Sequence, residues 1–234
     1  MHKALNRTIR QLLLGAALAA AGAANANLLV NGSFEKGAFV NQGNDTMSLN
    51  SGATAITGWT VLTDTTAWIG PTNPFGLSAS DGSFFLDLTN YQAGPPFAGV
   101  AQTFATIPGA RYSLTFDLGS STFWGRPDGL TASAGNASST FTALTTGTNN
   151  DWQRESMAFT ALAGATTLLL QGVSGFNYIG LDNVSVELIS APIPEPETWA
   201  LMLAGVSALA TIARRRGGAR DGRAPTRASP MRRP

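Results

Sequence analysis

The sequence predicts an all-β domain, a jelly-roll β-sandwich, flanked by an N-terminal signal helix and a short C-terminal transmembrane helix. Three observations lead to this prediction. The 234 residues include 26 glycines and only 12% charged residues, about half the ~25% of an average soluble domain. Short runs of alternating apolar and polar residues recur between turn dipeptides, with little helical periodicity. The absence of cysteine excludes a disulfide scaffold and thiolate metal sites.

Residues 1–26 are predicted to be a signal peptide. A basic start from Lys3 to Arg10 leads into an apolar run at residues 12–18, and Ala24-Asn25-Ala26 forms a small-x-small cleavage site. The alternative is an uncleaved N-terminal anchor, but the short, alanine-rich run favours cleavage after Ala26. This segment implies the Sec translocon and signal peptidase as partners.

Residues 27–190 are predicted to form the jelly-roll domain. Turns are expected at five dipeptides: Asn31-Gly32, Thr57-Gly58, Asp81-Gly82, Pro108-Gly109 and Asp128-Gly129. Strands are expected around residues 102–104 and over residues 83–88, 111–118, 157–160, 166–171 and 178–188. The strand at 111–118 has Tyr112, Leu114, Phe116 and Leu118 on one face. In the last strand the core set is Ile179, Leu181, Val184, Val186 and Leu188, so the alternation slips by one residue.

Residues 191–216 form a three-part segment. Pro194-Glu195-Pro196 lies in an extended, proline-rich stretch, residues 198–213 are apolar and uncharged, and Arg214, Arg215 and Arg216 follow. Sixteen helical residues would span about 24 Å, short of the ~30 Å hydrocarbon core, a deficit that snorkelling arginines would reduce. A buried core helix is the alternative, which the basic flank disfavours. Residues 217–234 are predicted to be a disordered basic tail.

The distribution of charge excludes several functions. The stretch 27–190 has four basic and eleven acidic residues, so its body repels phosphate backbones and nucleic-acid binding is not expected. The only histidine, His2, lies in the signal peptide. There is no serine-hydrolase string, phosphate loop or evident pair of glycosidase carboxylates. We therefore predict that the chain is not an enzyme.

The C-terminal segment resembles the PEP-CTERM sorting signal of Gram-negative bacteria. The resemblance rests on the motif 194–196, the apolar helix 198–213 and the basic cluster 214–216. It implies processing by an exosortase-type membrane protease. It also implies a precursor held transiently in the inner membrane, and then a place at the outer cell surface or in the extracellular matrix. The tail at 217–234 departs from the usual pattern, which ends soon after the arginines.

The body resembles galactose-binding-like jelly rolls, and in the order of its strings the domain of unknown function 642 family. The strings that carry this resemblance are NLLVNGSFE at 27–35, GWTV at 58–61, LDL at 86–88, GVAQTF at 99–104, PGARYSLTFDL at 108–118 and GLDNVSV at 180–186. The resemblance implies non-catalytic binding of a polysaccharide. The alternative is a structural or adhesion protein of the matrix that binds another protein, with a hydrolase as a distant third.

Six residues are candidate ligand contacts, because sugar rings stack on aromatic faces while charged groups reach their hydroxyls. Trp124, Arg126 and Asp128 lie together in one loop. Trp68 and Tyr91 lie in other predicted loops, and Tyr178 lies where a predicted loop meets the last strand. In the alternative interpretation, Phe123 and Trp124 close the edge of the sandwich. An exposed aromatic platform would favour glycan binding, and a broad apolar patch on one sheet would favour a protein partner.

Glu35 and Asp182 are candidate ligands of a structural Ca²⁺, although no cofactor is required. They lie near the first and last strands of the predicted domain, which are neighbours in jelly rolls of this type, and related modules often hold calcium there. Calcium takes six to eight oxygen ligands. In the alternative interpretation, the two carboxylates accept hydrogen bonds from backbone amides.

Overall fold

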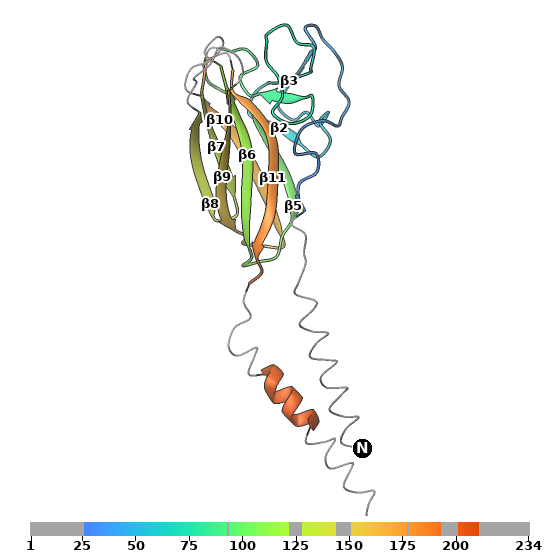
Figure 1. The fold of residues 1–234 in the computed structure, drawn as a ribbon, viewed down its shortest axis with the longest axis vertical. Coiled ribbons are helices and arrows are strands. Elements are labelled where there is room, and N and C mark those ends of the chain that lie inside the picture. Colours follow the sequence, from blue (N-terminus) through green and yellow to red (C-terminus); the bar gives the residue numbers. More distant parts are fainter. Residues whose placement is uncertain are drawn as a thin grey trace, which may run out of the picture. The chain divides into compact units, whose positions relative to one another are not determined.

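The computed structural model describes residues 26–92, 94–121, 128–143, 151–176, 178–192 and 201–210. The chain divides into two compact units, residues 1–192 and residues 193–234. The first unit is a sandwich of two antiparallel sheets (Figure 1). The all-β fold that the sequence predicts is therefore confirmed.

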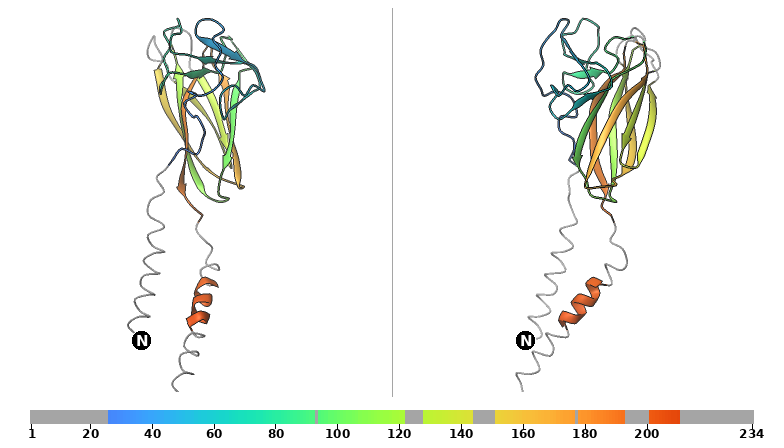
Figure 2. Two further views of the ribbon diagram at one scale, coloured as in Figure 1. Left: turned by 90° about the vertical axis from the view of Figure 1, so that its right-hand side faces the viewer. Right: turned by 180° about the vertical axis from the view of Figure 1, so that it is seen from behind.

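One sheet has six strands in the order β1-β3-β4-β11-β6-β9. Its strands are β1 (Thr46–Leu49), β3 (Thr66–Ile69), β4 (Phe85–Asp87), β6 (Arg111–Ser120), β9 (Asp151–Thr160) and β11 (Gly180–Ser190). The other sheet has five strands in the order β2-β5-β10-β7-β8. Its strands are β2 (Thr60–Leu62), β5 (Gly99–Ala105), β7 (Asp128–Ala134), β8 (Ala137–Ala143) and β10 (Ala165–Ser174). Residues 30–60 and 70–84 form mostly irregular segments beside the long strands (Figure 2).

The core between the sheets is built from alternating strand positions. In β6, Tyr112, Leu114, Phe116 and Leu118 are all buried, as the sequence predicts, because side chains two apart in a strand share a face. Trp59 and Trp68 also belong to this core. Their indole N–H groups donate to the carbonyls of Asn31 and Phe34, at 2.9 and 3.1 Å, which satisfies both buried donors.

The slip of alternation in β11 is a β-bulge. The register with β6 shifts between Asp182 and Ser185, where Asn183 has a φ of 52°. An extra residue in one strand turns the following side chains to the opposite face. Leu181, Val184 and Val186 are therefore all buried and Asp182 faces away from the main core.

The prediction of a turn at Asp128-Gly129 is wrong. These two residues begin β7, and Gly129 pairs with Thr142 in the ladder to β8. A Cβ on Gly129 would lie 2.2 Å from the Ser174 Oγ, so the glycine permits close packing of strands at this position. An Asp-Gly dipeptide in the sequence is compatible with either a turn or such a strand position.

A smaller second core covers part of the outer face of the six-stranded sheet. It contains Ala67, Ile69, Leu77, Phe85 and Tyr178. Trp152 closes this cluster, with its ring 5.8 Å from that of Phe85 and its N–H donating to the Ser78 carbonyl at 2.9 Å. The segment that contains Leu77 is therefore held against the sheet, although it has no regular structure.

The described part of the second unit is helical over residues 201–210. Within the described ranges, no helix combines the length and the apolar character that crossing a bilayer requires. The predicted transmembrane helix at 198–213 extends past these residues at both ends. The signal peptide up to residue 25 and the basic tail also lie outside the described residues.

Candidate functional site

A loop at residues 80–84 joins the two carboxylates that the sequence singles out. The Asp182 Oδ2 accepts hydrogen bonds from the backbone N–H groups of Ser80 and Asp81, at 2.8 and 3.0 Å. At the other end of the loop, the Glu35 Oε1 accepts from the N–H groups of Ser83 and Phe84, at 2.8 and 2.7 Å. Both predicted residues thus hold one short loop from its two ends.

Further polar residues, which the sequence analysis missed, complete this cluster. Asp81, in the middle of the loop, accepts a 2.6 Å hydrogen bond from the Ser33 hydroxyl. The Ser80 hydroxyl donates to Asp117 at 2.7 Å. Asp117 also pairs with Arg154 at 3.0 Å. Asp117 is separated from Asp182 by 65 residues in the chain, but the register of β6 with β11 places the two opposite each other, so only strand pairing reveals the cluster.

Two buried carboxylates of the domain, Asp182 and Asp87, have raised pKa values. Burial raises the pKa of Asp182 to about 7, against the opposing effect of hydrogen bonds from the Asp81, Asn183 and Ser80 N–H groups. Burial likewise raises the pKa of Asp87 to about 6, although that carboxylate accepts hydrogen bonds from Thr89 and from the Ile179 N–H. These two groups therefore change protonation near neutral pH.

A Ca²⁺ ion at this cluster would need several oxygens that are free to face it. Among the described residues, no three acidic or histidine side chains gather closely enough to form a cation site. Both oxygens of Asp182 accept from N–H donors, with Asn183 N at 2.6 Å from Oδ1, and an oxygen facing N–H groups is poorly placed for a cation. The arrangement supports the alternative interpretation, in which the carboxylates bind amides, and calcium stays a prediction.

The aromatic candidates lie in different surroundings. Trp68 and Tyr178 are each 1% exposed and belong to the main and the second core, respectively. Neither ring presents a face to solvent. Tyr91 is 40% exposed and its ring centroid lies 5.7 Å from that of Phe75. The structure does not bring these three residues into one solvent-facing site.

The remaining candidates lie outside the described residues. Trp124 and Arg126 fall in the gap between residues 121 and 128, and Asp128 is described only as the first residue of β7. The sorting residues Pro194, Glu195, Pro196, Arg214, Arg215 and Arg216 also fall outside. Their predicted roles stay predictions.

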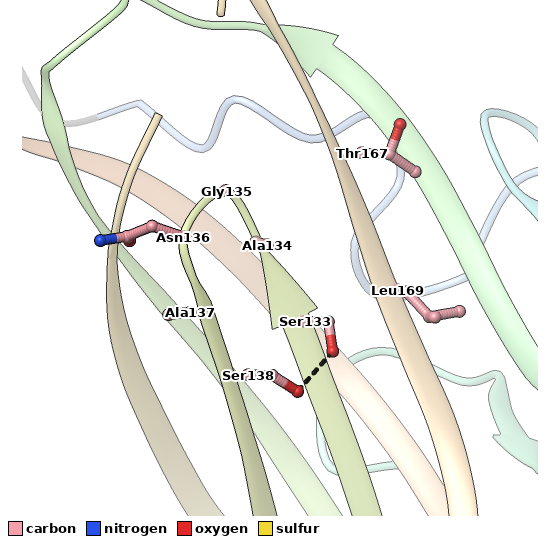
Figure 3. A pocket seen from close by; sticks show the side chains of 8 residues that line it. All are labelled: Ser133, Ala134, Gly135, Asn136, Ala137, Ser138, Thr167 and Leu169. Carbon is pink, nitrogen blue, oxygen red and sulfur yellow. Dashed lines mark hydrogen bonds between the residues drawn. The ribbon is translucent and has the colours of Figure 1, made fainter. Parts of the chain in front are cut away.

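The five-stranded sheet carries an open hollow that the sequence analysis missed. Its volume is about 500 Å³. Figure 3 shows its lining residues, which are Ser133, Ala134, Gly135, Asn136, Ala137, Ser138, Thr167 and Leu169. Six of these lie consecutively in the β7–β8 hairpin and two lie in β10. Gly135 turns the hairpin with a φ of 53°, and a Cβ there would lie 2.3 Å from the Thr160 carbonyl oxygen. Small polar side chains looked like ordinary strand surface in the sequence, because no aromatic or charged residue marks them.

Comparisons with known families match two parts of the chain. Residues 27–178 match the model of a protein family of unknown function, DUF642. Residues 192–216 match the PEP-CTERM protein-sorting motif. No curated protein is similar enough to count as a match.

Solved structures resemble the fold of the sandwich. A CBM4 structure has 16% identity and a TM-score of 0.39, covering 68% of this chain and 99% of its own. TmCBM61, solved in complex with β-1,4-galactotriose, has 15% identity and a TM-score of 0.42, covering 69% of this chain and 97% of its own. A family 35 carbohydrate-binding module from Clostridium thermocellum has 13% identity and a TM-score of 0.38, covering 63% and 93%. Scores this low carry no information about what this chain binds.

Proposed function

Because this chain belongs to the DUF642 family of proteins of unknown function and carries a PEP-CTERM protein-sorting motif, we propose that it is an exported surface protein with a non-catalytic carbohydrate-binding domain. The sorting motif supports secretion and exosortase processing in a Gram-negative bacterium. The proposed route runs through the Sec translocon and a transient inner-membrane precursor to the outer surface or the extracellular matrix.

The observation that carries the carbohydrate-binding part is the placement of Tyr91. Asn90 and Tyr91 have φ values of 47° and 68°, in the left-handed region that non-glycine residues rarely occupy. Tyr91 is 40% exposed, and its ring lies beside the ring of Phe75. Strained residues of this kind often occur at ligand-contacting loops, and a half-exposed aromatic ring is a surface on which a sugar ring stacks.

The polar surroundings of Tyr91 also suit a sugar. The Asn90 side-chain oxygen accepts a 2.9 Å hydrogen bond from the Ser48 hydroxyl, so a neighbouring amide is already held in place. Gln92 follows directly in the chain. Amide and hydroxyl groups both donate and accept hydrogen bonds, as the hydroxyls of a sugar require. A ring with amides at its edge therefore fits a small part of a glycan.

A specific observation also favours the second candidate, a matrix protein that binds another protein. Ile107 is 48% and Leu162 is 71% exposed. They lie in adjoining turns, since the Thr106 N–H donates to the Gly164 carbonyl at 3.0 Å. Exposed apolar residues that gather in one place are typical of protein contacts. This patch lies on turns and does not extend over a sheet face, so we place the candidate second.

The test is binding of the full chain to a glycan array in a non-ionic detergent without a sugar headgroup. We expect reproducible binding to one polymer class, and a loss of about tenfold in affinity, about 1.4 kcal/mol, with Tyr91→Ala or Trp124→Ala. The control is Val40→Ala, which removes a different exposed apolar side chain. Thermal melting of each variant separates lost contacts from lost folding.

Two outcomes would count against the proposal. A folded chain that binds nothing on the array would transfer support to the protein-binding candidate, which Ile107→Ser with Leu162→Ser would then test. A large fall in melting temperature for Trp124→Ala would assign that ring to the core instead of to a ligand.

A further inference from the structure

The outer face of the five-stranded sheet has an unusual composition. Strand alternation places threonine and serine side chains on it, namely Thr103, Thr131, Ser133, Ser138, Thr140 and Thr167, which we call the hydroxyl face. Leu169 and Ala101 lie between them, paired across β10 and β5. Among the described side chains of these five strands, none that points outward is charged.

The other sheet shows that this absence of charge is not a property of the whole domain. Its outer face presents Arg111, Asp117, Arg154 and Glu187 on β6, β9 and β11. Part of that face is also covered by the second core around Leu77 and Tyr178. The two outer faces of the sandwich thus differ in two ways: only the face of the six-stranded sheet presents charged side chains among the described residues, and only that face carries the second core. Solvent alone would favour charged side chains on both.

The hydroxyls of the hydroxyl face are ordered in cross-strand pairs. Thr131 pairs with Thr140 at 2.8 Å, and Ser133 pairs with Ser138 at 2.7 Å, as Figure 3 shows for the second pair. On the other side of β10, Thr103 pairs with Thr167 at 2.8 Å. One hydroxyl of each pair donates, so each pair keeps a proton and lone pairs for a ligand. Fixed rotamers also reduce the entropy that binding would cost.

The hollow described above lies on this face. Ser133, Ser138 and Thr167 line it together with the apolar Leu169 (Figure 3). A volume of about 500 Å³ lies within the range of small-ligand sites. Hydroxyls around an apolar patch match a sugar ring, which has polar edges and an apolar face.

We propose that the hydroxyl face binds an uncharged polysaccharide, as an extended chain lying across β8, β7, β10 and β5. This inference rests on the proposed function, specifies its ligand class and adds a second contact surface to the one around Tyr91. The charge of the domain and of this face favours an uncharged ligand over a charged one. The domain has eleven acidic and four basic residues between 27 and 190, so an anionic polymer is repelled, and the face itself offers a cationic polymer no carboxylate. A protein partner would need a larger apolar area than Leu169 and its small neighbours provide.

The experiment measures retention of the full chain by soluble polymers in native affinity gels. The neutral probes are galactomannan and mixed-linkage β-glucan, and the anionic probes are polygalacturonate and alginate. The test variant is Ser138→Lys with Thr167→Lys, which places two long side chains on the face. The matched control is Ser156→Lys with Ala158→Lys, two exposed positions on the outer face of β9, which changes the net charge equally.

We expect retention by a neutral polymer, at least a tenfold loss with Ser138→Lys/Thr167→Lys, and no loss with Ser156→Lys/Ala158→Lys. Melting temperatures should stay close to that of the parent, since all four positions are surface sites. If Tyr91→Ala abolishes retention and the face variant does not, the inference is overturned while the proposed function stands. If no polymer retains the chain, both fail.

Two other outcomes also overturn the inference. Retention by polygalacturonate or alginate alone would show that the ligand is anionic. The other outcome is a parent chain that is dimeric in analytical ultracentrifugation and is not retained by polymers, while the face variant is monomeric. This would show that a second copy of the chain covers the face.

Discussion

Single residues decide how this domain responds to its surroundings, and the buried carboxylates Asp87 and Asp182 are the main case. Both lie 1% exposed or less and accept several hydrogen bonds. Burial raises the pKa values of both carboxylates. The stability of the domain is therefore expected to depend on pH near neutrality.

We predict that the free energy of unfolding falls as the pH rises from about 4 to about 7. The pKa values of Asp87 and Asp182 are raised from 3.8 to about 6 and about 7 in the folded state. In this window the folded state binds more protons than the unfolded chain, so raising the pH disfavours folding, by on the order of a few kcal/mol in total. Urea unfolding at pH 4.5, 6 and 8 measures the effect.

Two amide variants serve as checks on this prediction. Asp87→Asn should remove the part of the slope that ends near pH 6, and Asp182→Asn the part that extends to about pH 7. Glu187→Gln, which changes a half-exposed acid on β11, should leave the slope unchanged. Stability that rises with pH across the window in the parent chain would contradict the assignment.

The calcium prediction also belongs to the residue scale. A cation shared by Glu35 and Asp182 would have to add to the amide hydrogen bonds that already hold the loop 80–84. If it does, EGTA should lower the melting temperature by a few degrees, about 1–2 kcal/mol, and Ca²⁺ but not Mg²⁺ should restore it. An unchanged melting temperature would leave backbone amides as the partners of both carboxylates.

Among the elements, β11 best shows what the sequence could and could not predict. Its alternation and its slip are visible in the residues themselves, because a bulge leaves a gap in an otherwise regular pattern. The pairing of Asp182 with Asp117 across β11 and β6 is not visible, since it depends on which strands become neighbours. The same reason explains the missed hollow, whose residues come from β7, β8 and β10.

Short strands were missed for a different reason. β1, β2 and β3 contain only three or four residues each, too few for alternation to stand out. β8 has mostly exposed residues, and its apolar positions Ala137, Phe141 and Ala143 are too few to stand out as a strand pattern in the sequence. Tertiary pairing stabilises such segments, and local sequence carries little of that information.

The bulge in β11 yields a prediction for Asn183. Its φ of 52° is one that asparagine tolerates better than alanine, and its amide donates to Asp117 at 3.0 Å. We expect Asn183→Ala to lower the free energy of unfolding by about 2 kcal/mol, since both the backbone preference and the hydrogen bond are lost. Asn183→Gly should cost less, because only the hydrogen bond is lost. Chemical denaturation of the two variants measures the difference in the free energy of unfolding. Equal losses for the two variants would show that the left-handed φ at residue 183 does not contribute to that difference.

At the scale of the whole molecule, charge is divided between the domain and its flanking segments. Of the eight arginines beyond residue 191, three lie at the end of the motif match at 192–216 and five follow it, whereas the sandwich is acidic. Composition and motif order alone were enough to recognise this division and the family, because neither depends on strand pairing. The hydroxyl face, which we propose as a ligand surface, could not be recognised in this way because it depends on strand pairing.

Sorting gives the prediction at this scale. We expect Glu195→Ala, or deletion of residues 194–196, to leave the full-length precursor in the inner membrane, because the processing enzyme would no longer recognise its motif. Immunoblots of fractionated cells expressing the chain distinguish the two forms by size. Glu197→Ala, just outside the motif, is the control. Normal maturation of the Glu195→Ala chain would refute the sorting assignment, and truncation before Gly217 would test whether the basic tail affects it.

The position of β11 would have a mechanical consequence in the membrane-held precursor that we propose, which would be tethered through its C-terminal end. β11 ends at Ser190, directly before the sorting segment, and it is paired along its length. β6 lies on one side, while β4 and the first residues of the domain lie on the other, where the Leu28 N–H donates to the Val186 carbonyl at 2.8 Å and Asn27 bonds to Val184 and Val186. Tension applied at the tether would act along this strand and load its hydrogen bonds together in shear, so that they resist as a group and do not open one after another.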